Sequence, residues 1–236
     1  MSTPAKPVCV VVGIGPGNGA ALARRFAKEG YAVALLARRT ELSEQLAAEL
    51  PDSRAYACDV ADVASVADTF ASIAKDMGPV DVVAYNAGSG TWGTVEDITP
   101  ENFEAAWRTN ALGLLLVSQQ VIPAMKAKGA GAIVVVGATA SRRGMPKTVS
   151  FAPAKAAQRS LAEGLAKHLW PLGIHVALVI LDGVVDLERT RKAMPDKGDD
   201  FFIRPDDVAE TVWWLARQPR SAWSFEVEAR PFGEKW

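Results

Sequence analysis

The sequence predicts an α/β protein built on a single doubly wound parallel sheet of about seven strands, with helices on both faces. Short apolar runs alternate with longer segments of helical spacing along the whole chain. A glycine-rich turn, Gly13–Gly19, stands between the first apolar run and the first helical segment. We expect residues 1–236 to form one domain, because no linker, repeat or low-complexity segment interrupts this pattern.

The strands are expected where apolar residues run without alternation, which is typical of strands buried on both faces. The expected strands are Val8–Val12, Ala32–Leu36, Arg54–Ala57, Val80–Ala84, Ala132–Val136, Ile174–Leu181 and, at the edge, Ser224–Glu228. Helical spacing, Pro at a first helical position and Gly or Pro beyond a last one mark the helices. The expected helices are Asn18–Lys28, Thr40 to about Leu50, Val63–Met77, one long helix from Pro100 to about Lys126, Phe151–Leu169 and Asp206–Arg217.

Composition excludes several classes of partner. The net charge is −1 and the basic residues are dispersed, which argues against nucleic acid or an anionic membrane as the main partner. No apolar run reaches the length of a membrane span. Cys9 and Cys58 stand in or beside apolar runs, as expected of buried thiols in a reducing compartment. We expect a cytoplasmic protein with a small-molecule substrate and no metal site.

Two connections are longer than their neighbours and leave the same edge of the expected sheet. They are Ser89–Ile98 and Asp182–Ile203. Ligands of open α/β sheets bind beyond the carboxyl ends of the strands, so these segments are candidate walls of a substrate pocket. The alternative is that both are surface insertions without a role.

The glycine-rich turn predicts a phosphate-binding site. Glycine adopts positive φ without strain, and its missing side chain lets the backbone approach a pyrophosphate closely. The helix that follows offers free N–H groups and the positive end of its dipole. We therefore expect a dinucleotide to contact Gly13, Ile14, Gly15, Gly17, Asn18 and Gly19.

Further landmarks follow in order along the chain. They are the spacing Gly13-x-x-x-Gly17-x-Gly19, Asp59-Val60, Asn86-Ala87-Gly88, Asn110, Lys155 and Asp182-Gly183. Together they resemble the short-chain dehydrogenase/reductase family over nearly the whole chain. The resemblance implies a Rossmann fold, an adenine site at Asp59 and Val60, and an active-site Asn at Asn110. It also places Asn86, Ala87, Gly88, Lys155, Gly183, Val184 and Val185 beside the cofactor.

The end of the second expected strand indicates which cofactor is bound. An acidic residue there would hydrogen-bond the adenosine ribose and repel a 2′-phosphate, but this chain has Ala37-Arg38-Arg39. A guanidinium pairs well with phosphate, and Arg38 stands where family members that prefer NADP often carry a basic residue. We predict NADP(H) rather than NAD(H). The alternative is that both arginines are solvated surface charges.

The proton donor that the resemblance implies is missing. Family members carry a Tyr four residues before the Lys and a Ser thirteen residues before that Tyr, where this chain has Phe151 and Ala138. A phenyl ring donates no proton, and losing a general acid costs about 10²–10⁴ in rate. We predict a slow or altered enzyme in which Lys155 binds the nicotinamide ribose and Asn110 holds a water.

Other groups are candidates for a replacement acid. Thr139, Ser141 and Ser150 are hydroxyls near the expected strand end. Asp182 replaces the usual family Pro, and a partly buried carboxyl group can carry a raised pKa. The more ordinary interpretation of Asp182 is a cap on a backbone turn.

Three functional hypotheses remain open at this point. The leading one is an NADP(H)-dependent oxidoreductase acting on a carbonyl or alcohol. The second is a non-catalytic NADP(H)-binding sensor or interaction protein, and the third an isomerase- or dehydratase-like activity that uses Asp182. The resemblance implies a homodimer or homotetramer through the helices that begin near Pro100 and Phe151. The tryptophans near the C-terminus are a second candidate interface or part of the core: Trp213, Trp214, Trp223 and Trp236.

Overall fold

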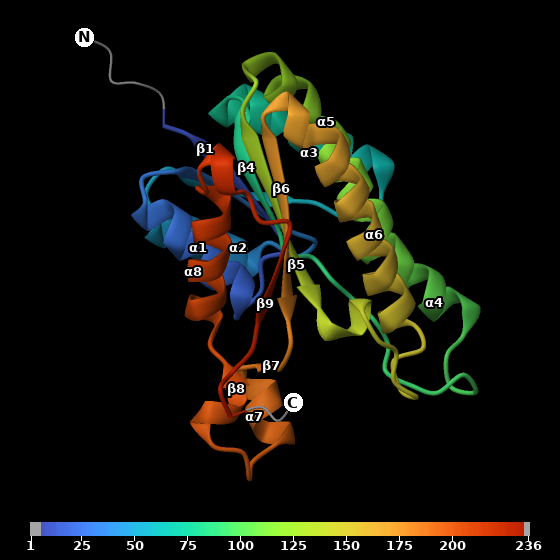
Figure 1. The fold of residues 1–236 in the computed structure, drawn as a ribbon. Helices are drawn as coiled ribbons and strands as arrows, with labels where there is room; N and C mark the ends of the chain where they lie inside the picture. Colours follow the sequence, from blue (N-terminus) through green and yellow to red (C-terminus); the bar gives the residue numbers. More distant parts are fainter. Residues whose placement is uncertain (1–5, 234–236) are drawn as a thin grey trace.

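The computed structural model describes residues 6–233, and its main feature is a seven-stranded parallel sheet in the order β3-β2-β1-β4-β5-β6-β9 (Figure 1). The predicted doubly wound fold is confirmed. The strands are β1 (Val8–Val12), β2 (Ala32–Ala37), β3 (Ser53–Ala57), β4 (Val80–Tyr85), β5 (Gly131–Ala138), β6 (Ile174–Leu181) and β9 (Glu226–Ala229). The strand order reverses at β1, so the crevice between β1 and β4 is the ligand-binding position expected of such sheets.

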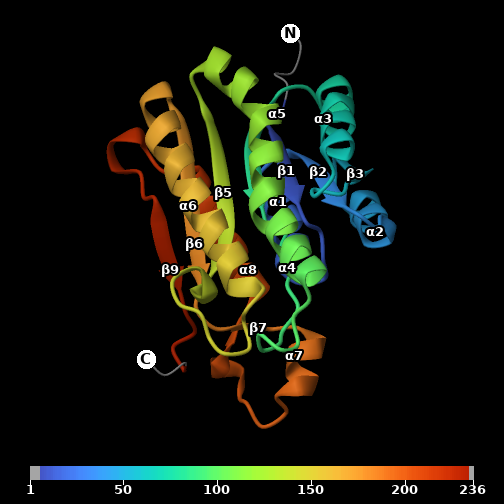
Figure 2. The ribbon, with the colours of Figure 1, turned by 90° about the vertical axis from the view of Figure 1, so that its right-hand side faces the viewer.

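Helices cover both faces of the sheet (Figures 1 and 2). Helices α1, α2 and α8 lie on one face, and α3, α5 and α6 lie on the other, with α4 continuing into α5. The bounds are α1 (Asn18–Lys28), α2 (Glu41–Glu49), α3 (Val63–Met77), α4 (Pro100–Trp107), α5 (Gly113–Lys128), α6 (Phe151–Leu169) and α8 (Pro205–Ala216).

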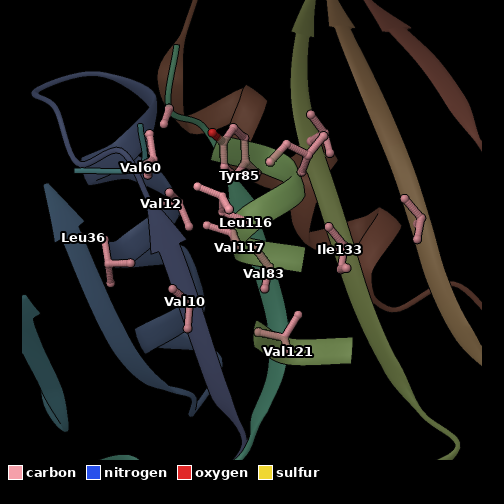
Figure 3. Packing of buried hydrophobic residues seen from close by; sticks show 14 of the residues in the cluster. Val10, Val12, Leu36, Val60, Val83, Tyr85, Leu116, Val117, Val121 and Ile133 are labelled. Atoms are coloured by element: carbon pink, nitrogen blue, oxygen red, sulfur yellow. The ribbon is translucent and has the colours of Figure 1, made fainter. Parts of the chain in front are cut away.

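Strand β1 explains why the central strands have continuous apolar sequences. Val10 and Val12 point into the core on the α5 side, whereas Cys9 and Val11 point into the core on the α1 side. All four are completely buried. Figure 3 shows Val10 and Val12 packed with neighbouring strand residues and with apolar side chains of α5: Val83, Ile133, Leu116, Val117 and Val121. Burial on both faces leaves no position for a polar side chain along β1.

The predicted long helix from Pro100 to Lys126 is interrupted. Residues Arg108–Leu112 form a π-helical turn between α4 and α5. Tyr85, at the end of β4, is fully buried and donates from its hydroxyl to the Thr109 carbonyl oxygen at 2.6 Å. Gly113, the first residue of α5, lies directly against that hydroxyl. Hydrophobic spacing does not reveal such a turn, because it inserts one residue without changing the apolar face of either helix.

The connection after β6, expected as a loop, contains three short elements. They are β7 (Val184–Val185), α7 (Glu188–Ala193) and β8 (Phe202–Ile203), and β7 pairs with β8 in parallel. They lie beyond the carboxyl edge of the main sheet (Figures 1 and 2). Two-residue strands and a six-residue helix are too short to produce a periodic sequence signal, which is why the sequence predicted a loop.

The C-terminal tryptophans belong partly to the core. Trp213 is 7% exposed and packs edge-on against Phe26, and Trp223 stacks on His175 with ring centroids 4.7 Å apart. Trp214 is half-exposed, and Trp236 lies outside the described residues. No helix within residues 6–233 is long and apolar enough to cross a membrane.

Candidate functional site

The glycine-rich turn follows β1 at the carboxyl edge of the sheet, and contacts on both sides fix its backbone. Gly13 has a φ of +95°, and a Cβ there would lie 2.6 Å from the Ala87 backbone nitrogen, so only glycine fits. The N–H groups of Gly13 and Ile14 both donate to the Leu36 carbonyl oxygen at 2.9 Å. Asn86 Nδ2 donates to the Gly13 carbonyl oxygen at 2.8 Å. The turn is therefore held in one shape by β2 and by the segment after β4.

The start of α1 suits an anionic group. The helix begins at Asn18, and Gly17 before it has no side chain to cap the first turn. Uncapped N–H groups and the positive end of the helix dipole attract phosphate. The Asn18 side-chain oxygen is buried without a hydrogen-bond partner in the described structure. This end of the helix therefore has unused hydrogen-bonding capacity.

A cavity of about 420 Å³ opens at this turn and collects residues from the ends of four neighbouring strands. Most residues predicted to bind the cofactor line it: Gly13, Ile14, Gly15, Gly17, Asn18, Gly19, Arg38, Asp59, Val60, Asn86, Ala87, Gly88 and Val185. Lys155, Gly183 and Val184 do not line this cavity. Segments far apart in the sequence thus meet at one place, as the parallel topology requires.

One end of the cavity is formed by Arg38, Asp59 and Val60. Arg38 follows β2, is exposed, and makes no ion pair with any of the residues 6–233. Asp59 fixes the turn after β3, because its carboxylate accepts from the Ala61 N–H at 3.0 Å. Arg39 is also exposed but does not line the cavity. Of the two arginines after β2, Arg38, which the sequence singled out, therefore lines the cavity.

Beyond Gly88, at the other end, lies the Lys155 ammonium group. Its Nζ lies 3.3 Å from where a Cβ on Gly88 would stand. Lys155 is 5% exposed and donates to the Val136 carbonyl oxygen at 3.1 Å and to Gln158 Oε1 at 3.0 Å. Burial lowers the pKa of Lys155 to about 8. The ammonium group therefore titrates much closer to neutral pH than an exposed lysine.

Gln158 is the residue at this site that sequence reasoning missed. It is completely buried one turn after Lys155, and its Nε2 donates to the Asn110 carbonyl oxygen at 3.0 Å. Asn110 lies in the π-helical turn, where the backbone deviates from regular α-helical hydrogen bonding. The one signal in the sequence is an uncharged polar residue three positions after the lysine on the same helix face.

The Asn110 side chain is also buried and points at the same place. Its Nδ2 donates to the carbonyl oxygens of Ser89 at 2.7 Å and Ala106 at 2.8 Å. Its Oδ1 has no hydrogen-bond partner in the described structure and lies 3.2 Å from a Cβ position on Gly88. Asn110 and Lys155, predicted as neighbours in the site, therefore do meet behind Gly88. The Asn110 carbonyl oxygen, however, is already bound by Gln158.

Comparison with known proteins identifies the family. A family model described as "short chain dehydrogenase" matches residues 7–198. The chain belongs to the short-chain dehydrogenase family. The D-xylose 1-dehydrogenase of Caulobacter vibrioides is 31% identical, over 90% of this chain and 89% of its own. The farnesol dehydrogenase of Aedes aegypti is 29% identical, over 97% of each chain.

Solved structures give the same result. A metagenomic short-chain oxidoreductase in complex with NADP superposes with a TM-score of 0.85 at 26% identity, covering 99% of this chain and 100% of that one. An alcohol dehydrogenase of the archaeon Thermococcus sibiricus, complexed with 5-hydroxy-NADP, superposes with a TM-score of 0.87 at 27% identity, covering 98% of each. The predicted membership and fold of this short-chain dehydrogenase are confirmed.

Phe151 occupies the position from which the family resemblance led us to expect a proton donor. It is the first residue of α6, and its ring lies against that of Trp92, with centroids 5.7 Å apart and planes 30° apart. Ala138 ends β5. The Lys155 Nζ lies 5.9 Å from the centre of the Phe151 ring. The chain's three tyrosines lie elsewhere, in or before β4.

Asp182 forms an ion pair. Its carboxylate accepts from Thr139 Oγ1 and from Arg230, and its backbone N–H donates to the Ala229 carbonyl oxygen at 2.9 Å. Asp182 is 8% exposed and does not line the cavity. These contacts connect the end of β6 to the end of β9. No contact of Asp182 supports a catalytic role. That role, and the isomerase- or dehydratase-like activity that depends on it, stay predictions.

The candidate hydroxyls are committed or buried. Thr139 donates to Asp182, and Ser150 Oγ donates to the Thr91 carbonyl oxygen at 2.8 Å. Ser141 Oγ is buried and has no hydrogen-bond partner in the described structure. The cavity wall also includes residues that the sequence did not single out, among them Leu187, whose side chain lies against Gly17, and Arg189 of α7. Leu187 immediately precedes α7, so both residues depend on a short element that the sequence did not reveal.

The lowered pKa of Lys155 predicts a pH-dependent stability. The folded pKa of about 8 lies below the unfolded value of 10.5, so the unfolded chain binds more protons between these pH values. The free energy of unfolding should therefore rise between pH 8 and 10.5, by up to roughly 3 kcal/mol. Urea unfolding across this range, compared with Lys155→Met, measures the effect. An identical pH slope in both proteins would contradict the assignment.

Proposed function

We propose that this chain is an NADP(H)-dependent oxidoreductase acting on a carbonyl or alcohol substrate, with an altered proton-donor site. The observation that carries the proposal is the cavity at the carboxyl edge of the sheet. It joins the glycine-rich turn, the Asp59–Val60 turn and the Asn86–Gly88 segment. Solved family members with NADP or 5-hydroxy-NADP bound support the choice of cofactor.

The residues present fit a dinucleotide. A Cβ at Gly13 would fill the space where the turn packs, and α1 presents uncapped N–H groups to a pyrophosphate. When bound, the reduced nicotinamide supplies a hydride. Lys155 has two of its three N–H groups committed to Val136 and Gln158, which leaves one to donate to the nicotinamide ribose. Gln158 fixes the direction of that donor.

Arg38 should decide the preference for NADP(H). No carboxylate stands at the end of β2 itself, and the Arg38 guanidinium there can bind a 2′-phosphate through charge-assisted hydrogen bonds. We expect Arg38→Ala to weaken NADPH binding by about 10- to 100-fold with little change in NADH binding. Isothermal titration calorimetry measures both constants.

Arg39→Ala is the matched control, because Arg39 is also exposed but does not line the cavity. It should leave the preference for NADPH over NADH intact. Comparable dissociation constants for NADPH and NADH in the natural protein would contradict the proposed cofactor.

The missing proton donor gives the second prediction. Lys155 and Asn110 both lie close to Gly88, whereas Phe151 and Ala138 offer no hydroxyl at the expected positions. The double variant Phe151→Tyr, Ala138→Ser should raise the rate of NADPH-dependent carbonyl reduction by about 10²–10⁴-fold. The assay compares initial rates of NADPH oxidation with a panel of ketones and aldehydes.

A second candidate function is an NADP(H)-binding sensor or interaction protein without turnover. The same absent hydroxyls at Phe151 and Ala138 favour it. It predicts tight NADPH binding and no turnover of any substrate in the natural protein. Turnover that appears only in the double variant would favour it over the oxidoreductase.

We also propose a cytoplasmic homodimer or homotetramer that associates through α4, α5 and α6. Exposed aromatic side chains on α4 support this, since Phe103 and Trp107 are 42% and 43% exposed in the single chain. Sedimentation equilibrium should give a mass at least twice that of one chain. A monomeric mass would contradict the proposed assembly.

A further inference from the structure

A second arginine lines the cofactor cavity, and it comes from the short helix α7. Arg189 contributes to the cavity wall together with Leu187, which immediately precedes α7. Among the described residues, the charged side chains of the wall are Arg38, Asp59 and Arg189. Two cations and one anion therefore surround the cavity at neutral pH, and this balance favours an anionic ligand.

Arg189 differs from the other basic residues of α7 in having no carboxylate partner. Arg191 donates to both carboxylate oxygens of Asp186, from Nε at 2.7 Å and from Nη2 at 2.8 Å. Lys192 donates to Glu188 Oε1 at 2.6 Å. Arg189 is exposed and forms no ion pair with any residue from 6 to 233. Its guanidinium is therefore available to a ligand in the cavity.

The backbone that carries Arg189 is fixed beside the glycine-rich turn. Thr190 Oγ1 donates to the Val185 carbonyl oxygen at 2.7 Å and accepts from the Leu187 N–H at 2.9 Å. The Leu187 side chain lies directly against Gly17, the residue before α1. The first turn of α7 is thus held next to the N-terminus of α1, so Arg189 needs no large movement of the chain to reach an anion there.

The two arginines of the cavity lie near different phosphates of the expected cofactor. Arg38 stands after β2 with Asp59, whereas Arg189 follows Leu187 and Gly17 at the start of α1. The N-terminus of this first helix is where the pyrophosphate of a dinucleotide is expected to bind. A guanidinium binds a phosphate oxygen through charge-assisted hydrogen bonds. Arg189 is therefore placed for the pyrophosphate, and Arg38 for the 2′-phosphate.

We propose that Arg189 binds the pyrophosphate of the dinucleotide. The proposal rests on the NADP(H)-dependent function above and adds a contact from the segment after β6. The glycine-rich turn and α1 offer uncharged N–H donors, and Arg189 supplies the positive charge that those groups lack. Because NADPH and NADH share the pyrophosphate, Arg189 contributes to the affinity for both, whereas Arg38 contributes to the choice between them.

The test is isothermal titration calorimetry with three probes that separate the phosphates. NADPH carries both kinds of phosphate, ADP-ribose carries only the pyrophosphate, and 2′-AMP carries only the 2′-phosphate. We expect Arg189→Ala to weaken the binding of NADPH and ADP-ribose by about 5- to 50-fold and to leave the binding of 2′-AMP almost unchanged. Arg38→Ala should instead weaken NADPH and 2′-AMP and leave ADP-ribose almost unchanged.

Two further variants control for charge and for folding. Lys192→Ala removes an exposed cation from the same helix, but Lys192 is paired with Glu188 and does not line the cavity. It should leave the dissociation constants of all three probes almost unchanged. Arg189→Lys keeps the charge and loses the planar donor group, so it should retain part of the affinity for ADP-ribose. Circular dichroism confirms that each variant is folded.

The outcomes distinguish this proposal from the proposed function. Unchanged ADP-ribose binding in Arg189→Ala would overturn the assignment of Arg189, and so would an absence of ADP-ribose binding in a natural protein that binds NADPH. An equal loss of 2′-AMP and ADP-ribose binding, or an equal effect of Lys192→Ala, would also overturn it. Failure of the natural protein to bind NADPH would contradict the proposed function, and this proposal with it.

Discussion

A buried ammonium group organises the nicotinamide end of this protein. Lys155 of α6 donates to a carbonyl oxygen of β5 and, through Gln158, is linked to the π-helical turn before α5. Removing a partner from a buried charge is strongly destabilising, so these three elements are constrained to keep their acceptors in place. The positions of Gly88 and of the Asn110 side chain follow from this constraint, because both pack against the same ammonium group.

The glycine-rich turn and the expected proton-donor position lie in different parts of the chain. The turn is fixed by Leu36 and Asn86, and none of its hydrogen bonds among the described residues involves α6. Phe151, where the family resemblance predicts a protic side chain, begins α6 and has an apolar ring. A change at Phe151 would therefore leave the hydrogen bonds of the turn intact. The proposed loss of the proton donor is in this way compatible with an intact cofactor cavity.

The sequence predicted the parts of the structure that are set by burial and by backbone geometry. Strand β1 is apolar throughout because both of its faces are covered, and Gly13 is required because the Ala87 backbone occupies the space of a side chain. Ordered landmarks then placed Lys155 and Asn110 together. Gln158 was missed because its role depends on how α6 packs against a π-helical turn, and the turn itself leaves no mark on hydrophobic spacing. The β7–α7–β8 segment was missed because its elements are too short for a hydrophobic period to repeat within them.

The central claim is that this chain binds the family's cofactor while lacking a hydroxyl at the expected proton-donor positions. Parallel measurements on the natural protein and on the Phe151→Tyr, Ala138→Ser variant test it most directly, with the NADPH dissociation constant and the rate of carbonyl reduction determined for both. We predict similar NADPH binding and a reduction rate about 10²–10⁴-fold higher in the variant. Equal reduction rates in the two proteins would contradict this account.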